Sequence, residues 1–250
     1  MVHLMNLQKN RTRRIFATCL ILAFLLPLCL PFYSSAATRS NVFFSCHTDR
    51  KVIALTFDDG PHPRYTRQIL SLLKEYGITA TFFMVGVNIT RYPDVARAVA
   101  EGGHAIGNHT YTHPPVKERG DEEMRAEILR AEKEIEDIVG KKPTVFRPPE
   151  GTCPNRISSL AGRLGYSVIL WTVDTRDWAA TPPEKIVSNV MGHVKSGDIL
   201  LFHDYVSYKN TTIDALKILL PMLIREGYQF VTVPELLMEE ERYFESQAVS

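Results

Sequence analysis

Short apolar runs alternate with amphipathic segments along most of this chain. The runs are nearly continuous in apolar residues, which is typical of parallel strands buried on both faces. Seven strands are predicted, at Val52–Phe57, Thr79–Val85, His104–Gly107, Thr144–Arg147, Ser167–Val173, Ile199–His203 and Gln229–Val233. Strands that alternate with helices favour one parallel sheet, either closed into a barrel or open.

The segments between these runs carry the apolar spacing and the end signals of helices. From Asp121 to Val139 apolar residues recur at three- and four-residue steps, and Gly140 ends the pattern. A second helix is predicted from Thr181-Pro182-Pro183-Glu184, which combines a capping box with proline in the first turn. Further helices are predicted at Pro63–Tyr76, Pro93–Glu101, Asn155–Leu164 and Thr211–Glu226, the last with a kink at Pro221.

The first 37 residues have the pattern of an export segment. Basic side chains come first (Lys9, Arg11, Arg13 and Arg14), and an uncharged apolar stretch follows over 15–33. Ser35 and Ala37 fit a cleavage site after Ala37, yet the apolar stretch approaches membrane-spanning length. Residues 1–37 are therefore predicted to be either a cleaved signal peptide or a retained N-terminal membrane anchor. In both cases the body is predicted to lie outside the cytoplasm.

The body that follows has the length and composition of one globular domain. It is divided here into a polar stem over 38–50, a main domain over 51–237 and a C-terminal tail over 238–250. With 45% hydrophobic and 23% charged residues, the chain is neither disordered nor a polytopic membrane protein. Cys46 and Cys153 remain outside the export segment, either as one disulfide or as two free thiols.

Charge excludes one class of partner. The formal net charge is +1, and the export segment supplies four basic residues and no acidic one, so the body is slightly acidic. Binding to nucleic acid depends on clustered lysine and arginine at the phosphate backbone. Nucleic acid is therefore not expected as a partner.

Polar residues collect where the predicted strands end. In α/β barrels the carboxyl ends of the strands meet at one rim, which is where active sites form. Five polar segments lie at or just after such ends: Asp58-Asp59-Gly60-Pro61, His109-Thr110-Tyr111-Thr112-His113, Arg147-Pro148-Pro149-Glu150-Gly151, Asp174-Thr175-Arg176-Asp177-Trp178 and Leu200-Leu201-Phe202-His203-Asp204.

The second segment is a candidate metal site. His109 and His113, four residues apart, are predicted to lie on one face of a helical turn, where they can share a metal ion. Thr110 stands where the metalloprotease motif His-Glu-x-x-His has its glutamate base, so a base must come from elsewhere. The pair Asp58 and Asp59 offers one carboxylate as a third ligand and one to spare.

These five segments, in this order and spacing, resemble the motifs of the polysaccharide deacetylase family, the NodB-homology domains of carbohydrate esterase family 4. The resemblance covers about residues 50–236, so the main domain is expected to be its catalytic domain. It implies a single α/β domain with a distorted (β/α) barrel of seven to eight mostly parallel strands.

The resemblance also implies a metal site and a base. Asp59, His109 and His113 would bind one divalent metal ion, with zinc expected first and cobalt, manganese, nickel or iron left open. Asp58 would act as general base, and Arg147 would hold it in place in its ionised form.

The remaining implied roles concern the acid and the substrate. His203 would act as general acid, oriented by Asp177, and Trp178 and Leu201 would form an apolar pocket for the acetyl methyl group. Glu150 stands where the family usually has tyrosine or phenylalanine. Its backbone N–H can still face the oxyanion, but its carboxylate leaves the choice of sugar open.

The expected activity is therefore metal-dependent removal of N-acetyl groups from a β-linked amino-sugar polymer, first N-acetylglucosamine in peptidoglycan and then chitin oligomers. Two alternatives remain open: an O-acetyl esterase of the acetylxylan type, and a non-catalytic wall-binding envelope protein on the same fold. The expected partner is an acetylated glycan, with membrane contact only through a retained anchor. The protein is expected to be secreted or anchored, associated with the cell wall, and monomeric by default.

Overall fold

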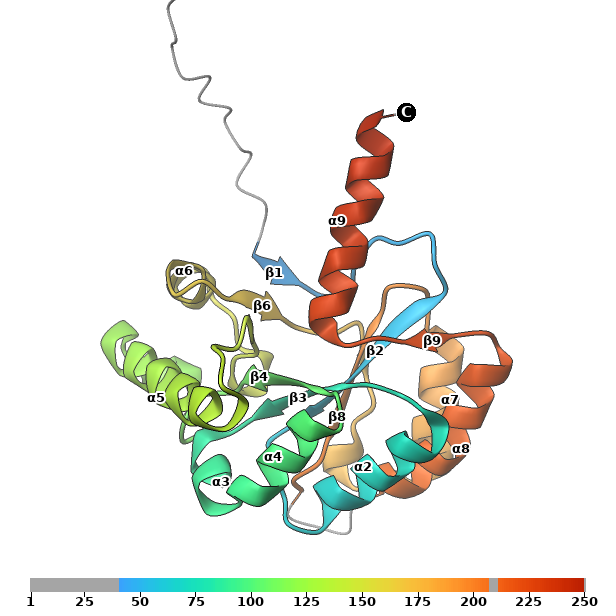
Figure 1. Ribbon diagram of the computed structural model, residues 1–250, viewed down its shortest axis with the longest axis horizontal. Coiled ribbons are helices and arrows are strands. Elements are labelled where there is room, and N and C mark those ends of the chain that lie inside the picture. The colour runs from blue at the N-terminus through green and yellow to red at the C-terminus, as the bar shows by residue number, and fades with distance from the viewer. Residues whose placement is uncertain (1–40, 207–210, 250) are drawn as a thin grey trace, which may run out of the picture. The chain divides into compact units, whose positions relative to one another are not determined.

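A parallel sheet wrapped by helices forms the body of the protein in a computed structural model (Figure 1). The structure describes residues 41–206 and 211–249. The predicted export segment, residues 1–37, lies outside the described residues. None of the helices in the described part has both the length and the apolar character that crossing a membrane requires.

The sheet is built from short strands: β1 (Val42–Phe43), β2 (Val52–Asp58), β3 (Thr81–Met84), β4 (Ala105–Asn108), β5 (Val145–Phe146), β6 (Ser167–Ile169), β7 (Val173–Asp174), β8 (Ile199–His203) and β9 (Gln229–Phe230). Their order is β1-β6-β5-β4-β3-β2-β8-β7, and β9 pairs with the start of β2. The ladders between these strands are parallel. The predicted distorted barrel of seven to eight mostly parallel strands is confirmed.

Strand β2 pairs with β3, β8 and β9, and every one of its residues is buried. The Phe57 ring stacks on Phe82 of β3 with 4.9 Å between centroids, and it lies 5.8 Å from Phe202 of β8. In the ladder between β2 and β8, Asp58 is the register partner of His203. The polar ends of the two central strands therefore lie at the same edge of the sheet.

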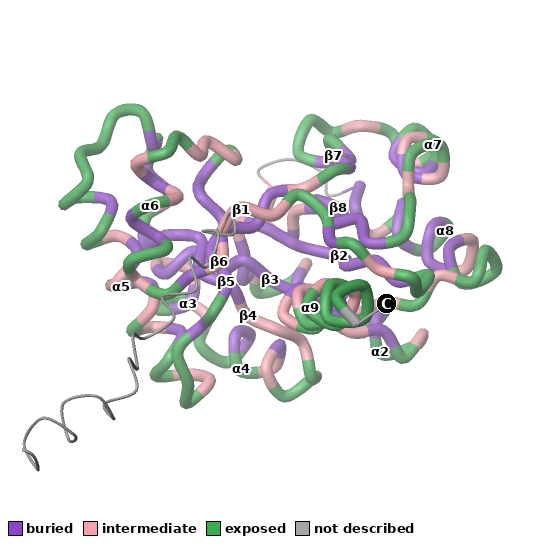
Figure 2. The backbone as a smooth tube through the Cα atoms, turned by 90° about the horizontal axis from the view of Figure 1, so that it is seen from above, coloured by how far each residue is buried: buried purple, intermediate pink, exposed green. Residues whose placement is uncertain are grey.

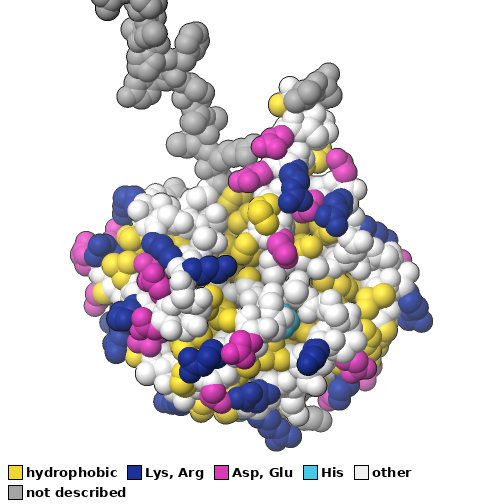
Figure 3. Space-filling view, in the orientation of Figure 1, with side chains coloured by type: hydrophobic (Ala, Val, Ile, Leu, Met, Phe, Trp, Pro, Cys, Tyr) yellow, Lys and Arg dark blue, Asp and Glu magenta, His cyan; other side chains and the backbone are white. Residues whose placement is uncertain are grey.

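Helices cover the sheet, so the buried residues concentrate in the strands and the exposed ones on the outer helices (Figure 2). They are α2 (Tyr65–Tyr76), α3 (Gly86–Arg91), α4 (Pro93–Glu101), α5 (Asp121–Val139), α6 (Asn155–Arg163), α7 (Pro183–His193), α8 (Thr212–Arg225) and α9 (Val233–Val249). Helix α5 has the predicted bounds and ends at Gly140, which adopts a left-handed conformation with φ 75°. On the face shown in Figure 3, basic and acidic side chains are interspersed.

One predicted helix start is corrected, and one helix was not predicted. Helix α7 begins at Pro183 after an N-cap at Pro182, and no side chain caps it. The hydroxyl of Thr181 instead donates a hydrogen bond to the carbonyl of Arg176, so the predicted capping box does not form. Helix α3, which was not predicted, has only six residues and lacks the length over which helical periodicity is recognisable.

The predicted strand Ser167–Val173 is in fact two strands, β6 and β7, at different places in the sheet. β6 pairs with β1 and β5, whereas β7 pairs with β8. Between them, the carbonyls of Ile169 and Leu170 accept hydrogen bonds from the buried guanidinium of Arg147. The apolar run is continuous because both strands are buried, so hydrophobicity alone does not show the break.

The predicted stem and tail take part in the folded unit. Within the stem, β1 pairs with β6, and Cys46 is buried. Helix α9 runs across the predicted boundary at 237/238. The predicted strand Gln229–Val233 is shorter in the structure: it ends at Phe230, and Val233 already belongs to α9. Cys46 and Cys153 are free thiols.

Candidate active site

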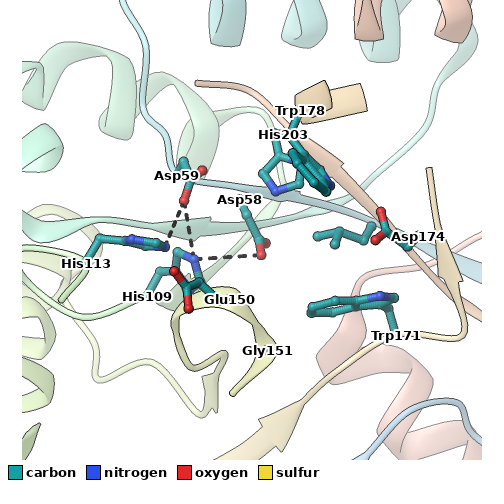
Figure 4. A pocket seen from close by; sticks show the side chains of 11 residues that line it. Asp58, Asp59, His109, His113, Glu150, Gly151, Trp171, Asp174, Trp178 and His203 are labelled. Carbon is teal, nitrogen blue, oxygen red and sulfur yellow. Dashed lines mark ion pairs between the residues drawn. The ribbon is translucent and has the colours of Figure 1, made fainter. Parts of the chain in front are cut away.

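A cavity of about 460 Å³ opens at the carboxyl ends of the strands (Figure 4). The side chains of all the predicted site residues except Arg147 and Asp177 lie along it, and these two are buried behind its wall. The lining consists of Asp58, Asp59, His109, His113, Glu150, Gly151, Trp171, Asp174, Trp178, Leu201 and His203. The fold therefore brings the five polar segments to one place.

Three potential metal ligands converge at one side of the cavity. Oδ1 of Asp59 lies 3.4 Å from Nε2 of His109 and 3.4 Å from Nε2 of His113. Ligands bound to a tetrahedral ion at about 2.0–2.1 Å lie roughly 3.4 Å apart. The three residues thus offer one donor atom each at a spacing that fits a single divalent ion.

The two histidines reach this position from a loop, not from the predicted helical turn. Thr110 and His113 have positive φ values of 66° and 57°, which a right-handed helix does not contain. Oδ1 of Asn108 accepts a hydrogen bond from the Thr110 amide, and Glu127 of α5 accepts two further amides of the loop. These side chains bond the loop amides that a helix would bond with its own backbone. The four-residue spacing therefore identified the two histidines, but it did not predict the conformation between them.

Buried hydrogen bonding fixes the orientation of His109. Its Nδ1–H donates to the carbonyl of Arg147 at 2.7 Å, so Nε2 is the ring nitrogen that faces Asp59. Burial disfavours a charge on His109, but the charges of Asp58 and Asp59 outweigh it and raise its pKa. For Asp59, burial is likewise outweighed by His109, His203 and His113, which lower its pKa to about 2. Asp59 is therefore ionised, as a metal ligand must be.

Asp58 lies next to this cluster and is held by a buried arginine. Its Oδ1 accepts a hydrogen bond from Arg147 at 2.7 Å, and its Oδ2 lies 3.8 Å from Nε2 of His109. The Arg147 side chain is fully buried and also donates to the hydroxyl of Thr56 at 2.8 Å. Its guanidinium lies 4.1 Å from the centroid of the Phe83 ring. Arg147 therefore fixes one oxygen of Asp58 and leaves the other beside the metal-ligand cluster.

A second acid–base pair lies across the cavity. His203 Nδ1–H donates to Oδ1 of Asp177 at 2.8 Å, and Oδ2 of Asp177 accepts the His203 amide at 2.8 Å and the hydroxyl of Thr212 at 2.6 Å. Burial opposes a charge on His203, but the hydrogen bond and charge of Asp177, with Asp58 and Asp59, raise its pKa to about 9. His203 is therefore an imidazolium at neutral pH, with Nε2 left for the cavity.

The predicted substrate contacts also line the cavity, with different exposure. The Trp178 side chain is half exposed, whereas Leu201 is almost fully buried. Glu150 lies in a 3₁₀ turn over Pro149–Gly151, with a left-handed φ of 57° and an exposed side chain. Glu150 and His109 line the same cavity (Figure 4).

Trp171 and Asp174 line the cavity but were not predicted as site residues. Trp171 lies within the apolar run that was read as one strand, so its sequence context gave no sign of a functional position. A Cβ atom at Gly151 would overlap the Trp171 ring, which explains why glycine follows Glu150. Asp174 belongs to the fourth polar segment, and its position in that segment was the available signal.

Asp204 supports the site from behind and was also not predicted. It is fully buried, its Oδ2 accepts a hydrogen bond from Thr66 at 2.5 Å, and its Oδ1 has no hydrogen-bond partner among the described residues. Burial, reinforced by Asp59 and Asp58, raises its pKa to about 7 although the Thr66 bond opposes this. A Cβ atom at Gly60 would overlap the Asp204 carboxylate, so Asp204 packs against the turn that follows Asp58 and Asp59.

Known proteins share this arrangement in sequence and fold. The sequence profile described as polysaccharide deacetylase matches residues 46–169. A peptidoglycan-N-acetylglucosamine deacetylase of Bacillus cereus is 44% identical over 191 residues, which are 76% of this chain and 89% of the relative. A chitooligosaccharide deacetylase of Azorhizobium caulinodans is 34% identical, over 73% of this chain and 92% of that protein.

The fold agrees with these sequence relationships. A crystal structure of a peptidoglycan N-acetylglucosamine deacetylase aligns with a TM-score of 0.77 and 33% sequence identity, over 81% of this chain and 95% of the other. The resemblance noted from the five polar segments is therefore confirmed by sequence and by structure. The chain belongs to the polysaccharide deacetylase family.

Proposed function

We propose that this protein is a metal-dependent hydrolase that removes N-acetyl groups from N-acetylglucosamine in a β-linked glycan, with peptidoglycan as first substrate and chitin oligomers as second. One observation carries the proposal. Asp58, held by Arg147, and His203, held by Asp177, flank the metal-ligand cluster within one cavity (Figure 4). The names of the relatives from Bacillus cereus and Azorhizobium caulinodans support the choice of these two glycans.

The residues fit a metal ion of the kind this chemistry uses. Asp59, His109 and His113 would hold it, and zinc is the proposed ion because imidazole and carboxylate are common zinc ligands. Cobalt, manganese, nickel and iron accept the same ligand set. When bound, such an ion lowers the pKa of water to about 7 and polarises a carbonyl oxygen.

Asp58 is the proposed general base. Its Oδ2 would accept a proton from the attacking water, because Oδ1 is already occupied by Arg147. The guanidinium holds the Asp58 carboxylate and prevents it from turning away. The backbone N–H of Glu150 is proposed to donate to the oxyanion that forms at the acetyl carbonyl.

His203 is the proposed general acid. An amine is a poor leaving group unless it is protonated, so breaking the C–N bond requires a proton at the sugar nitrogen. His203 would deliver that proton from Nε2, while Asp177 holds Nδ1. The products are acetate and a glucosamine residue. Trp178 and Leu201 are proposed to contact the methyl of the departing acetyl group.

We also propose that the protein acts outside the cytoplasm, secreted or anchored on the outer face of the cytoplasmic membrane. The proposal is supported by the basic and then apolar pattern of residues 1–37. Peptidoglycan is met on that side of the membrane, so location and proposed substrate agree.

Acetate release from N-acetylglucosamine oligomers, purified peptidoglycan and acetylxylan, measured with and without a chelator, tests the proposed activity. The first two substrates are expected to release acetate in a chelator-sensitive manner. Release from acetylxylan alone would instead support the O-acetyl esterase, and binding without release from any substrate would support the non-catalytic alternative. Release that persists after complete metal removal would contradict the mechanism.

Variants separate the roles of the residues. Asp58→Asn and His203→Ala are expected to lose turnover and keep zinc, because neither side chain belongs to the ligand set. Glu75→Gln, an exposed change on α2, is the matched surface control and is expected to behave like wild type. Wild-type turnover in either cavity variant would contradict the role assigned to that residue.

A further inference from the structure

Glu150 is the cavity carboxylate that the proposed chemistry leaves without a partner. Asp58 pairs with Arg147, and Asp59 lies among the metal ligands. Within the described residues, the Glu150 side chain makes no hydrogen bond and no ion pair, although it lines the same cavity. Among the described residues, no side chain therefore pairs with its carboxylate.

The backbone holds this charge in place. Pro148 and Pro149 are buried, and they restrict the chain before Glu150. The amide of Gly151 donates to the Pro148 carbonyl at 3.1 Å, which closes the turn. Because the Gly151 backbone also packs against Trp171, the turn has little room to move away from the cavity. Glu150 is thus presented to the cavity from a fixed turn (Figure 4).

In the described lining, the imidazolium of His203 is already paired with Asp177. The lining contains no lysine or arginine, and Arg147, behind the wall, is fully buried and bonded to Asp58. Arg176 lies outside the lining, with its guanidinium carbon 5.8 Å from the centroid of the Trp178 ring. A second carboxylate, Asp174, lines the cavity away from the metal ligands and accepts the backbone amide of Arg176 at 2.8 Å.

We infer that Glu150 makes the cavity select sugars by charge. Neutral sugars and those that carry an ammonium group are accepted, and sugars that carry a carboxylate near the acetamido group are disfavoured by repulsion between like charges. In peptide-free glycan strands this distinguishes N-acetylglucosamine from N-acetylmuramic acid, whose lactyl ether bears a free carboxylate when no stem peptide is amide-linked to it. The inference rests on the proposed deacetylase function and adds a residue that determines its specificity.

The test compares one glycan in two charge states. Peptide-free fragments of alternating N-acetylglucosamine and N-acetylmuramic acid are prepared with the lactyl carboxylates free or methyl-esterified, and kcat/KM for acetate release is measured for each. Wild type is expected to favour the ester about tenfold at low ionic strength, equal to about 1.4 kcal/mol. The ratio is expected to shrink as salt is added, because salt screens charge but not shape.

Glu150→Gln removes the charge and keeps the side-chain length and the backbone N–H. The variant is expected to lower the ester-to-acid ratio to about twofold, whereas Glu75→Gln leaves it at the wild-type value. Equal rates on ester and acid in wild type, or an unchanged ratio in Glu150→Gln with normal zinc content and melting temperature, would overturn the inference while the deacetylase function stands. A neutral N-acetylglucosamine tetramer serves as the control for function. If wild type releases no acetate from it, both the inference and the proposed deacetylase function are overturned.

Discussion

Replacing Asp177 by asparagine tests how His203 remains protonated. In the native site the Asp177 carboxylate accepts Nδ1–H of His203 at 2.8 Å, and its charge favours the imidazolium. Asparagine fills nearly the same space but carries no charge. The basic limb of the pH profile of kcat/KM is therefore expected to move down from about 9 toward the ordinary histidine value of 6.5.

The size of the effect follows from these two values. At 1.36 kcal/mol per pH unit, the difference corresponds to about 3 kcal/mol of preference for the imidazolium. At pH 7.5, His203 is about 97% protonated with a pKa near 9 but about 9% protonated at 6.5. Loss of the general acid form alone is thus expected to reduce kcat/KM about tenfold at pH 7.5, and lowering the pH to 6 is expected to restore part of it.

The same shift predicts a pH dependence of stability. The pKa of His203 is higher in the folded state, so its pairing with Asp177 stabilises the fold fully below pH 6.5. That contribution disappears as the pH rises through about 9. Urea denaturation of wild type and Asp177→Asn is therefore expected to show the largest difference in unfolding free energy at low pH and a smaller one above pH 9.

The assay is a pH–rate profile from pH 5 to 10 with the zinc-loaded enzyme and an N-acetylglucosamine oligomer. Asp174→Asn is the matched control, because it removes a nearby carboxylate, at the end of β7, that is not bonded to His203. Its basic limb is expected to coincide with that of wild type. A basic limb near 9 in Asp177→Asn, or a loss of activity that is independent of pH, would refute the reasoning.

Three further changes probe the framework around the cluster. Arg147→Met leaves Asp58 unpaired and is expected to lower the free energy of unfolding by about 3–5 kcal/mol in urea denaturation; an unchanged midpoint would count against a buried ion pair. Gly60→Ala is expected to lower the melting temperature and weaken zinc binding by displacing the turn. Gly192→Ala, where the added methyl meets open space on α7, is its control, and its free energy of unfolding is expected to rise by up to about 1 kcal/mol. His113→Ala is expected to retain no stoichiometric zinc by elemental analysis after dialysis, and full occupancy would remove it from the ligand set.

The positions of the functional residues were largely predictable from sequence. Each polar segment follows or ends an apolar run, and parallel strands bring such ends to one rim. The same reasoning located the two histidines and the Asp58-Asp59 pair, and the family resemblance implied Asp59 as the third ligand. The structure places the ligand atoms of Asp59, His109 and His113 within 4.8 Å of one another. Helix α5 was predictable to the residue because its signals are local: apolar spacing along the helix and glycine after it.

Features that depend on distant partners were not predictable from the pattern. The split between β6 and β7 arises because each strand pairs with different neighbours, which an unbroken apolar run does not reveal. The histidine loop looked helical by spacing, but hydrogen bonds from Asn108 and Glu127 hold it in another conformation.

The sequence by itself determined which chemical groups this protein has and the edge of the sheet at which they gather. Each strand and the polar residues at its end are recognisable from the local sequence. Only the tertiary structure decided how they are charged. Asp204 is buried against Thr66, 138 residues earlier in the chain, and burial raises its pKa to about 7. Glu150, by contrast, is exposed at the cavity and has no hydrogen-bond or ion-pair partner among the described residues. Burial and partners set the charge of a carboxylate, and both are properties of the folded chain.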